Sequence, residues 1–116
     1  MEDLELQRLV QIKELIENNL ADTNVTNDWV AAELMLSTRT LYRIIQNLTG
    51  KTPNHYIRSI RLEKAYELLE IQKYSTVKEV VAQIGFKKVD YFSLLFKEKY
   101  GFSPVEVLKG NRRKLE

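Results

Sequence analysis

The feature that most constrains this chain of 116 residues is an internal repeat. Matching residues lie 50 positions apart in the first part of the repeat and 51 apart in the second, so one extra residue sits near the second turn. The pairs are Thr26 and Thr76, Val30 and Val80, and Leu34 and Ile84 at the first spacing, then Leu41 and Phe92, Gly50 and Gly101, and Pro53 and Pro104 at the second. Each copy has the pattern of a short helix, a tight turn and a longer helix. The repeat predicts an all-α fold with two helix-turn-helix subdomains.

Apolar residues recur at helical spacing through most of the chain, and only two prolines and four glycines interrupt them. We expect about seven helices. The first runs from about Asp3 to Asn19, and its expected apolar stripe is Leu6, Leu9, Val10, Ile12, Leu15 and Ile16. A short helix follows the N-cap residue Thr26, and Ser37 caps a third helix that ends at Gly50.

A long linking helix is expected from Pro53 to about Glu70. Its inward residues are Tyr56, Ile57, Ile60, Ala65, Leu68 and Leu69. The second copy then opens with the capping-box pair Thr76 and Glu79, turns at Gly85-Phe86 and continues with a helix from near Lys88 to Gly101. The apolar anchors of that helix are expected to be Tyr91, Phe92, Leu95 and Phe96, and Ser103 with Glu106 caps a last short helix.

These elements divide the chain into four parts of one domain. Residues 1–52 hold the first helix and the first helix-turn-helix, and residues 53–70 form the linking helix. Residues 71–110 hold the second helix-turn-helix and the last short helix, and residues 111–116 are expected to be a frayed tail.

Charge is distributed unevenly along the chain. Residues 1–36 hold eight acids and two bases, a net charge of −6, whereas residues 37–116 hold sixteen bases and eight acids, a net charge of +8. A basic segment of this kind attracts phosphate backbones, although many solvated surfaces carry a similar imbalance without using it. The acidic first helix is expected to act as scaffold.

Several classes of protein are disfavoured. The chain has no cysteine, so it lacks a disulfide framework, and its N-terminus has neither the pattern of a signal peptide nor that of a membrane span. Its single histidine, His55, has no second histidine or diagnostic acid beside it, and the four glycines are too far apart to cradle a phosphate. We therefore expect a cytoplasmic protein that is not an enzyme and needs no metal or cofactor.

The linking helix sets the expected separation of the two recognition helices. About 17 residues at a rise of ~1.5 Å make a strut roughly 26 Å long. With the helix widths added, the span approaches the roughly 34 Å of one DNA turn, so one chain is expected to enter two successive major grooves of an asymmetric site.

The chain resembles the C-terminal DNA-binding domain of AraC/XylS-type bacterial transcription regulators from about Val25 to Val107. The matching stretches are Ser37-x-x-x-Leu41-Tyr42-Arg43, Gly50-Lys51-Thr52-Pro53, Tyr56-Ile57-Arg58-x-Ile60-Arg61-Leu62-x-x-Ala65-x-x-Leu68-Leu69, Gly85-Phe86, Tyr91-Phe92-Ser93-x-x-Phe96-Lys97 and Tyr100-Gly101-x-Ser103-Pro104. Leu48-Thr49-Gly50 and Tyr56-Ile57-Arg58 are most similar to output domains of hybrid two-component regulators. The resemblance implies promoter binding and transcriptional control.

In the first unit, the resemblance places Arg39, Tyr42 and Arg43 at the bases, with Thr38, Thr40 and Lys51 at phosphates. An arginine fork donates two hydrogen bonds to guanine, and Tyr42 suits a phosphate or a thymine methyl. The alternative for Arg43 is a surface salt bridge. For Arg58 and Arg61 of the linking helix, packing and ion pairing are favoured over base contacts.

The second recognition helix departs from the family pattern. Lys87 and Lys88 replace the usual small polar residue and Asp, exchanging a helix cap for charge that suits phosphate, as does Lys97. Val89, Asp90 and Leu94 are placed at the bases, but they offer few donors, so the first unit is expected to dominate base readout. Asp90 either accepts from cytosine N4 or favours the helix N-terminus.

Trp29 stands where the corresponding helix of the resembled family is usually polar. Packing is favoured for Trp29 over an exposed partner surface. The expected partner is double-stranded promoter DNA, with RNA polymerase and a sensor or receiver domain outside this chain as further candidates. The competing hypothesis is a helix-turn-helix module that has lost specific DNA readout and binds a protein, for example through the acidic first helix.

Overall fold

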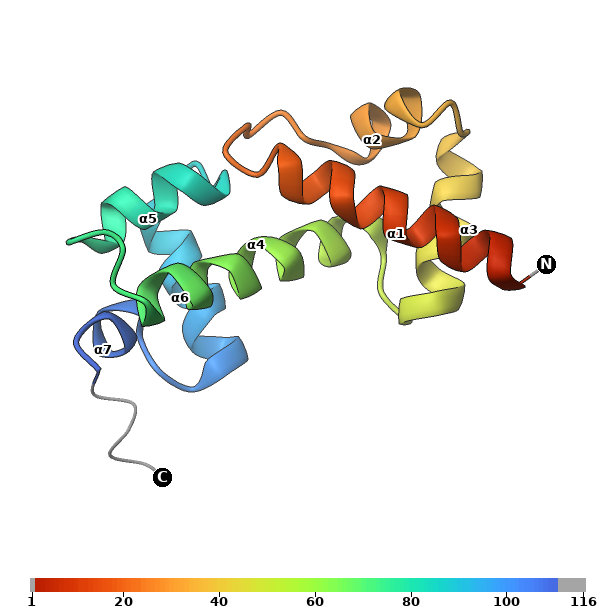
Figure 1. Ribbon diagram of the computed structural model, residues 1–116. Helices are drawn as coiled ribbons and strands as arrows, with labels where there is room; N and C mark the ends of the chain where they lie inside the picture. The colour runs from red at the N-terminus through yellow and green to blue at the C-terminus, as the bar shows by residue number, and fades with distance from the viewer. Residues whose placement is uncertain (1, 111–116) are drawn as a thin grey trace. The chain divides into compact units, whose positions relative to one another are not determined.

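Residues 2–110 form seven α-helices in the part of the chain that this computed structural model describes (Figure 1). They are α1 (Glu2–Asn18), α2 (Asn27–Glu33), α3 (Thr38–Thr49), α4 (Pro53–Glu70), α5 (Val77–Ile84), α6 (Val89–Tyr100) and α7 (Pro104–Leu108). No strand occurs in this range, so the predicted all-α class with two helix-turn-helix motifs is confirmed. The tail expected to be frayed, residues 111–116, lies outside the described residues.

Local hydrogen bonds explain where the helices begin and end. The hydroxyls of Thr26, Ser37 and Thr76 each accept from a backbone N–H three residues on, as N-caps do. Ser103 and Glu106 form the predicted capping box. At the other ends, Gly50, Gly85 and Gly101 adopt left-handed conformations that terminate α3, α5 and α6.

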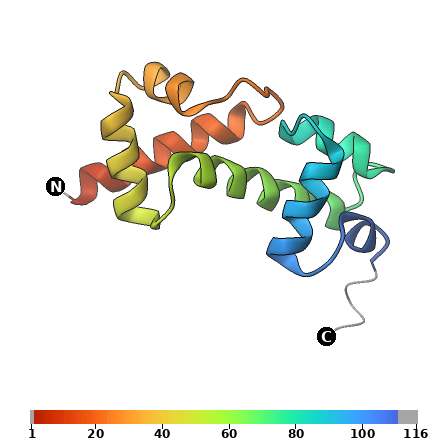
Figure 2. The same ribbon diagram turned by 180° about the vertical axis from the view of Figure 1, so that it is seen from behind.

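The chain divides into two units, residues 1–60 and 61–116. In the first unit, α1 lies against α3 and α2, as both ribbon views show (Figures 1 and 2). Its core joins residues of α1, α2, α3 and the first half of α4: Ile12, Ile16, Leu20, Val25, Val30, Ala31, Leu41, Ile44, Ile45, Tyr56, Ile57 and Ile60. Trp29 packs against this cluster, which confirms the packing interpretation.

The expected stripe of α1 is partly wrong. Ile12 and Ile16 are fully buried, and Leu9 and Leu15 pack against the core, but Leu6 and Val10 are 49% and 55% exposed. Leu6 and Val10 are four residues apart and lie, on average, roughly 120° around α1 from Ile12 and Ile16, outside the buried face. Apolar content alone therefore overestimated the width of the buried stripe.

The second unit has its own core, built from the second half of α4 with α5, α6 and α7 (Figure 2). The buried residues are Leu62, Ala65, Leu68, Leu69, Val80, Val81, Ile84, Phe92, Phe96 and Val107. Phe92 and Phe96 anchor α6 as predicted, and Leu95 is partly buried. Tyr91 is not such an anchor, because its side chain is 48% exposed; its ring lies edge to face with that of Phe86, with 6.3 Å between ring centres.

Among residues 2–110, no helix is long and apolar enough to cross a membrane.

Candidate functional site

The exposed face of α3 carries the polar residues that the sequence singled out. Leu41, Ile44 and Ile45 are buried on one side of the helix, so its period turns the remaining residues outward. The outward set is Thr38, Arg39, Tyr42, Arg43 and Gln46, all of them exposed. We call these five residues the α3 face.

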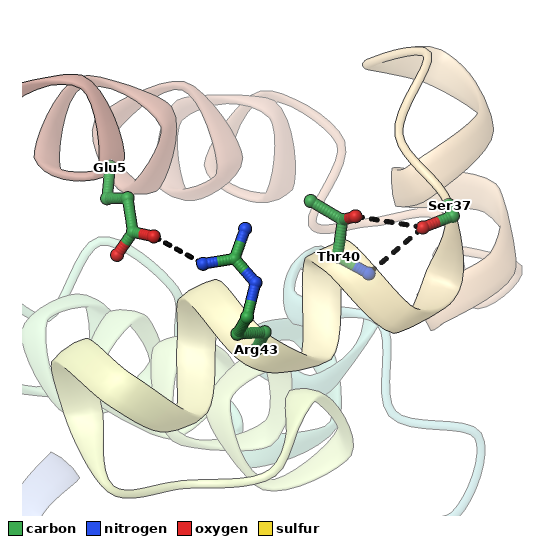
Figure 3. Close-up of polar contacts among 4 residues, drawn as sticks. All are labelled: Glu5, Ser37, Thr40 and Arg43. Atoms are coloured by element: carbon green, nitrogen blue, oxygen red, sulfur yellow. Dashed lines mark hydrogen bonds and ion pairs between the residues drawn. The ribbon is translucent and has the colours of Figure 1, made fainter. Parts of the chain in front are cut away.

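Thr40 takes part in the hydrogen bonds that cap the start of α3. Its backbone N–H donates to the Ser37 hydroxyl at 3.0 Å, and that hydroxyl donates to the Thr40 Oγ1 at 2.9 Å (Figure 3). Together these bonds satisfy the N-terminus of the helix. The half-buried Thr40, for which a phosphate contact was predicted, is therefore also part of the helix cap.

A hollow of about 740 Å³ runs along the α3 face. The start of α2 and the start of α4 form its other walls. Its lining residues are Asn27, Asp28, Thr38, Arg39, Thr40, Tyr42, Arg43, Gln46, Asn47 and Pro53. The structure thus brings Arg39, Tyr42 and Arg43 together around one concave surface in the first unit, whereas half-buried Lys51 lies just beyond the end of α3.

Arg43 forms an ion pair that bridges two helices. Its Nη1 donates to Oε1 of Glu5 in α1, and the two side chains are 52% and 28% exposed (Figure 3). The surface salt bridge considered for Arg43 is therefore present in the structure. The pair is exposed enough that its net contribution to stability is small, about 0–1 kcal/mol.

Glu5 was not among the residues predicted for the site. Glu5, Leu9, Ile12 and Ile16 follow one another at helical spacings of four, three and four residues, so the acid lies on the buried face of α1. An acid in line with buried apolar residues is the signal that sequence reasoning had available. Its partner, 38 residues away, is set by tertiary packing and has no local signal.

In the second unit, α6 corresponds to α3 at the 51-residue spacing, but its surface differs. Lys87, Lys88, Asp90, Leu94 and Lys97 are exposed. Lys88 occupies the N-cap position and makes no side-chain cap hydrogen bond, so the expected exchange of a cap for charge is confirmed. Lys97 also lies close enough to Glu106 to contribute to lowering the pKa of that carboxyl, after the larger effects of hydrogen bonds from the Ser103 backbone and side chain.

Packing fixes the orientation of α6. Phe86, Phe92, Phe96 and Tyr100 form a series of ring contacts, with centroids 5.3, 5.5 and 4.8 Å apart. Burial, reinforced by Glu63 and Tyr66, raises the pKa of Tyr100 to about 12. Val89 is half-buried against the same core, so it is less accessible than Asp90 and Leu94.

Two other residues considered from the sequence, Arg61 and His55, lie on α4. Arg61 is buried and its Nη1 donates to the Gly85 carbonyl, so the packing role favoured over base contact is confirmed, with a backbone carbonyl as partner. His55 is exposed at the start of α4. Within the described residues, no three His, Asp or Glu side chains form a cluster that could hold a metal ion.

Comparison with known proteins identifies one family model and a consistent set of relatives. Residues 30–110 match a family described as a helix-turn-helix domain. The HTH-type transcriptional activator RhaS of Escherichia coli is 36% identical over 95 residues, which are 82% of this chain and 34% of RhaS. The chain therefore spans about a third of the length of the curated relatives it matches.

Solved structures of the same kind are similar over most of the chain. The C-terminal domain of AraT, a response regulator from Geobacillus stearothermophilus, has a TM-score of 0.76 and 29% identity, covering 86% of this chain and 82% of that domain. The DNA-binding domain of AdpA, a global transcriptional factor solved with a target DNA, has a TM-score of 0.79 and 26% identity, covering 91% and 94%. These relatives are transcription regulators rather than enzymes.

Proposed function

The chain belongs to the AraC-type helix-turn-helix domain family, and on this premise we propose that it binds specific sequences of double-stranded DNA and thereby regulates transcription. The observation that carries the proposal is the α3 face, where Arg39, Tyr42 and Arg43 line one hollow on an exposed recognition helix. An α-helix of this kind fits the major groove, and arginine forks recognise guanine there. The AdpA domain, which is similar over most of the chain, was solved with a target DNA.

We propose that the two units contribute unequally. Arg39 and Arg43 of α3 correspond to Asp90 and Leu94 of α6, so the second unit presents an acid and an apolar side chain where the first presents two arginine forks. The first unit then dominates base readout with Arg39, Tyr42 and Arg43. The second enters a neighbouring major groove, where Lys87, Lys88 and Lys97 contact phosphates and Asp90, Leu94 and the less accessible Val89 face the bases. Thr38, Thr40 and Lys51 are assigned to phosphates in the first unit.

The cellular setting is also a proposal. Relatives such as RhaS are bacterial regulators, which supports a cytoplasmic location where the bacterial chromosome lies. AraT is a response regulator, which supports a link to two-component signalling. Contacts with RNA polymerase and control by a sensor or receiver domain are proposed for the whole regulator, since the chain matches only 34% of RhaS.

The test is selection of bound duplexes from a random DNA pool at near-physiological salt, followed by sequencing. We expect two unequal half-sites about one helical turn apart. An Arg39→Ala, Arg43→Ala variant should lose the stronger half-site, because each good arginine contact supplies about 1–3 kcal/mol of base discrimination. A steep decrease of affinity with salt should accompany specific binding.

A protein-interaction module is the second candidate, and the exposed apolar residues of α1 favour it. Leu4, Leu6 and Val10 are each about half exposed on a helix with a net negative charge, an arrangement compatible with a protein partner. If the selection enriches no duplex and affinity is found only for a protein, this second function replaces DNA recognition.

A further inference from the structure

Glu5 is held in place by the packing of α1. It continues the line of Leu9, Ile12 and Ile16 along α1; Leu9 packs against the first core, and Ile12 and Ile16 are fully buried in it. Leu9 therefore anchors α1 one helical turn after Glu5. Only the carboxylate end of this side chain extends past the core to the guanidinium of Arg43 (Figure 3).

The ion pair occupies one part of the Arg43 guanidinium and leaves another part open. Glu5 accepts from Nη1, the terminal nitrogen on the same side of the group as Cδ. The nitrogens Nε and Nη2 form the opposite, side-on edge, which lies away from the Glu5 carboxylate in Figure 3. A side-on edge has two parallel N–H groups, the geometry that matches O6 and N7 of guanine.

A carboxylate at this position has opposing effects on DNA binding. It repels phosphates, so it lowers affinity for every duplex. It also restricts a long, flexible side chain to one orientation, which favours the base that this orientation fits. A contact that weakens all binding and sharpens one base preference increases specificity.

We propose that Glu5 is a positioning residue for Arg43, holding the guanidinium so that its Nε and Nη2 edge recognises one guanine and suppressing binding to other sequences. This inference rests on the proposed DNA-binding function. Arg39 provides an internal comparison: it lies one helical turn before Arg43, lines the same hollow, and forms no ion pair with the side chains that the structure describes, those of residues 4–110. The base pair assigned to Arg39 is therefore independent of Glu5.

The experiment compares Glu5→Gln with Glu14→Gln. Glu14 is an exposed acid of the same helix, so its variant removes the same charge without touching Arg43. Dissociation constants are measured for the selected site, for its single-base variants and for random-sequence DNA. Arg43→Ala identifies the base pair that Arg43 recognises, and thermal unfolding shows that each variant is folded.

We expect Glu5→Gln to lose up to about fivefold discrimination at that one base pair, the limit set by the small free energy of an exposed ion pair. Discrimination at the Arg39 base pair stays unchanged, and affinity for random DNA rises several-fold. Glu14→Gln changes no base preference. In the Arg43→Ala background, Glu5→Gln has no further effect on discrimination, because the side chain that it positions is gone.

Glu5→Asp separates position from charge. It keeps the negative charge but is one methylene shorter, so we expect it to lose discrimination while affinity for random DNA stays low. If Glu5→Gln tightens binding to all duplexes and leaves every base preference intact, Glu5 only repels or competes and the proposal is overturned. If the unaltered chain shows no base preference at all, the proposed function fails, and this inference fails with it.

Discussion

Met35 occupies a backbone conformation that suits glycine better than methionine. Its φ is 57°, in the left-handed region, at the turn between α2 and α3. The corresponding turn of the second unit has Gly85 with a φ of 80° at the 50-residue spacing. The Met35 side chain is 92% exposed, so packing does not compensate the backbone cost.

Met35→Gly is expected to stabilise the first unit. Relief of a left-handed conformation is worth about 1–2 kcal/mol, and the greater freedom of glycine in the unfolded chain offsets part of it, leaving a gain of about 0.5–1 kcal/mol. Chemical denaturation measures the change. Met35→Ala, which keeps a Cβ, should give no comparable gain; equal stabilisation by both variants would contradict the argument from φ.

Glu106 makes the stability of the second unit depend on pH. Hydrogen bonds from the Ser103 backbone and side chain hold its pKa below the ordinary value of 4.5. A lowered pKa in the folded state means that the carboxylate stabilises the fold above the unfolded pKa and that this contribution disappears as pH falls through the folded pKa.

We expect the stability difference between the unaltered chain and Glu106→Gln to be constant above about pH 5 and to shrink below pH 4.5. Denaturation midpoints measured between pH 3 and pH 7, a range that spans the model-peptide pKa of glutamate, give this stability difference. Glu98→Gln, which alters an exposed acid of α6, is the control. A difference that grows as pH falls would mean that the carboxylate is not stabilised by its cap.

Single residues of the site differ in how well the sequence predicts them. Arg39, Tyr42 and Arg43 could be predicted as exposed, because they alternate with Leu41, Ile44 and Ile45 at helical spacing. The pairing of Arg43 with Glu5 could not, since it depends on where α1 crosses α3. Leu6, Val10 and Tyr91 were assigned inward because they are apolar or aromatic, but the position of neighbouring helices decides which face is covered.

The two recognition helices, α3 and α6, differ in how their N-termini are capped. Ser37 caps α3 with a hydrogen bond to the Thr40 N–H at 3.0 Å, whereas Lys88 places a cation at the positive end of the α6 dipole and makes no cap bond. Stability of the helix is thus exchanged for charge near the proposed phosphate contact. Such ends were predictable from sequence because capping is local.

Lys88→Ser should reverse this exchange. A serine N-cap contributes about 0.5–2 kcal/mol, so thermal unfolding of the second unit should move to a higher temperature. Loss of one phosphate contact should reduce the slope of log affinity against log salt by about 1. Lys87→Ser removes the same charge one residue before the N-cap, so it should reduce the slope without stabilising the helix. Equal stabilisation by both variants would contradict a capping effect at Lys88.

At the scale of the whole chain, the structure contains two cores rather than one. The first comprises residues of α1, α2, α3 and the first half of α4, and the second comprises the second half of α4 with α5, α6 and α7. The repeat predicted two subdomains and the periodicity of α4 predicted its buried residues, because both follow from spacing along one helix. Which halves of α4 serve which core emerges only from the packing of helices distant in sequence.

Separate cores predict separate unfolding, and the chain provides a natural reporter. Trp29 is its single tryptophan and packs against the first core, so its fluorescence follows the first unit, whereas far-UV circular dichroism follows both. Ile44 is fully buried in that core. Ile44→Ala should cost about 2–5 kcal/mol, a large share of the stability of a unit of this size.

We therefore expect Ile44→Ala to lower the fluorescence midpoint by much more than the midpoint of the remaining helical signal. Ile84→Ala alters a fully buried residue of the second core. It should leave the midpoint of the Trp29 fluorescence transition nearly unchanged, while part of the helical signal is lost at a lower midpoint. Since α4 contributes to both cores, each variant should unfold the half of α4 that packs in the altered core. The early loss of far-UV circular dichroism signal should therefore differ in amplitude between the two variants. Coincident transitions by both probes in both variants would show that α4 couples the two units into one cooperative fold.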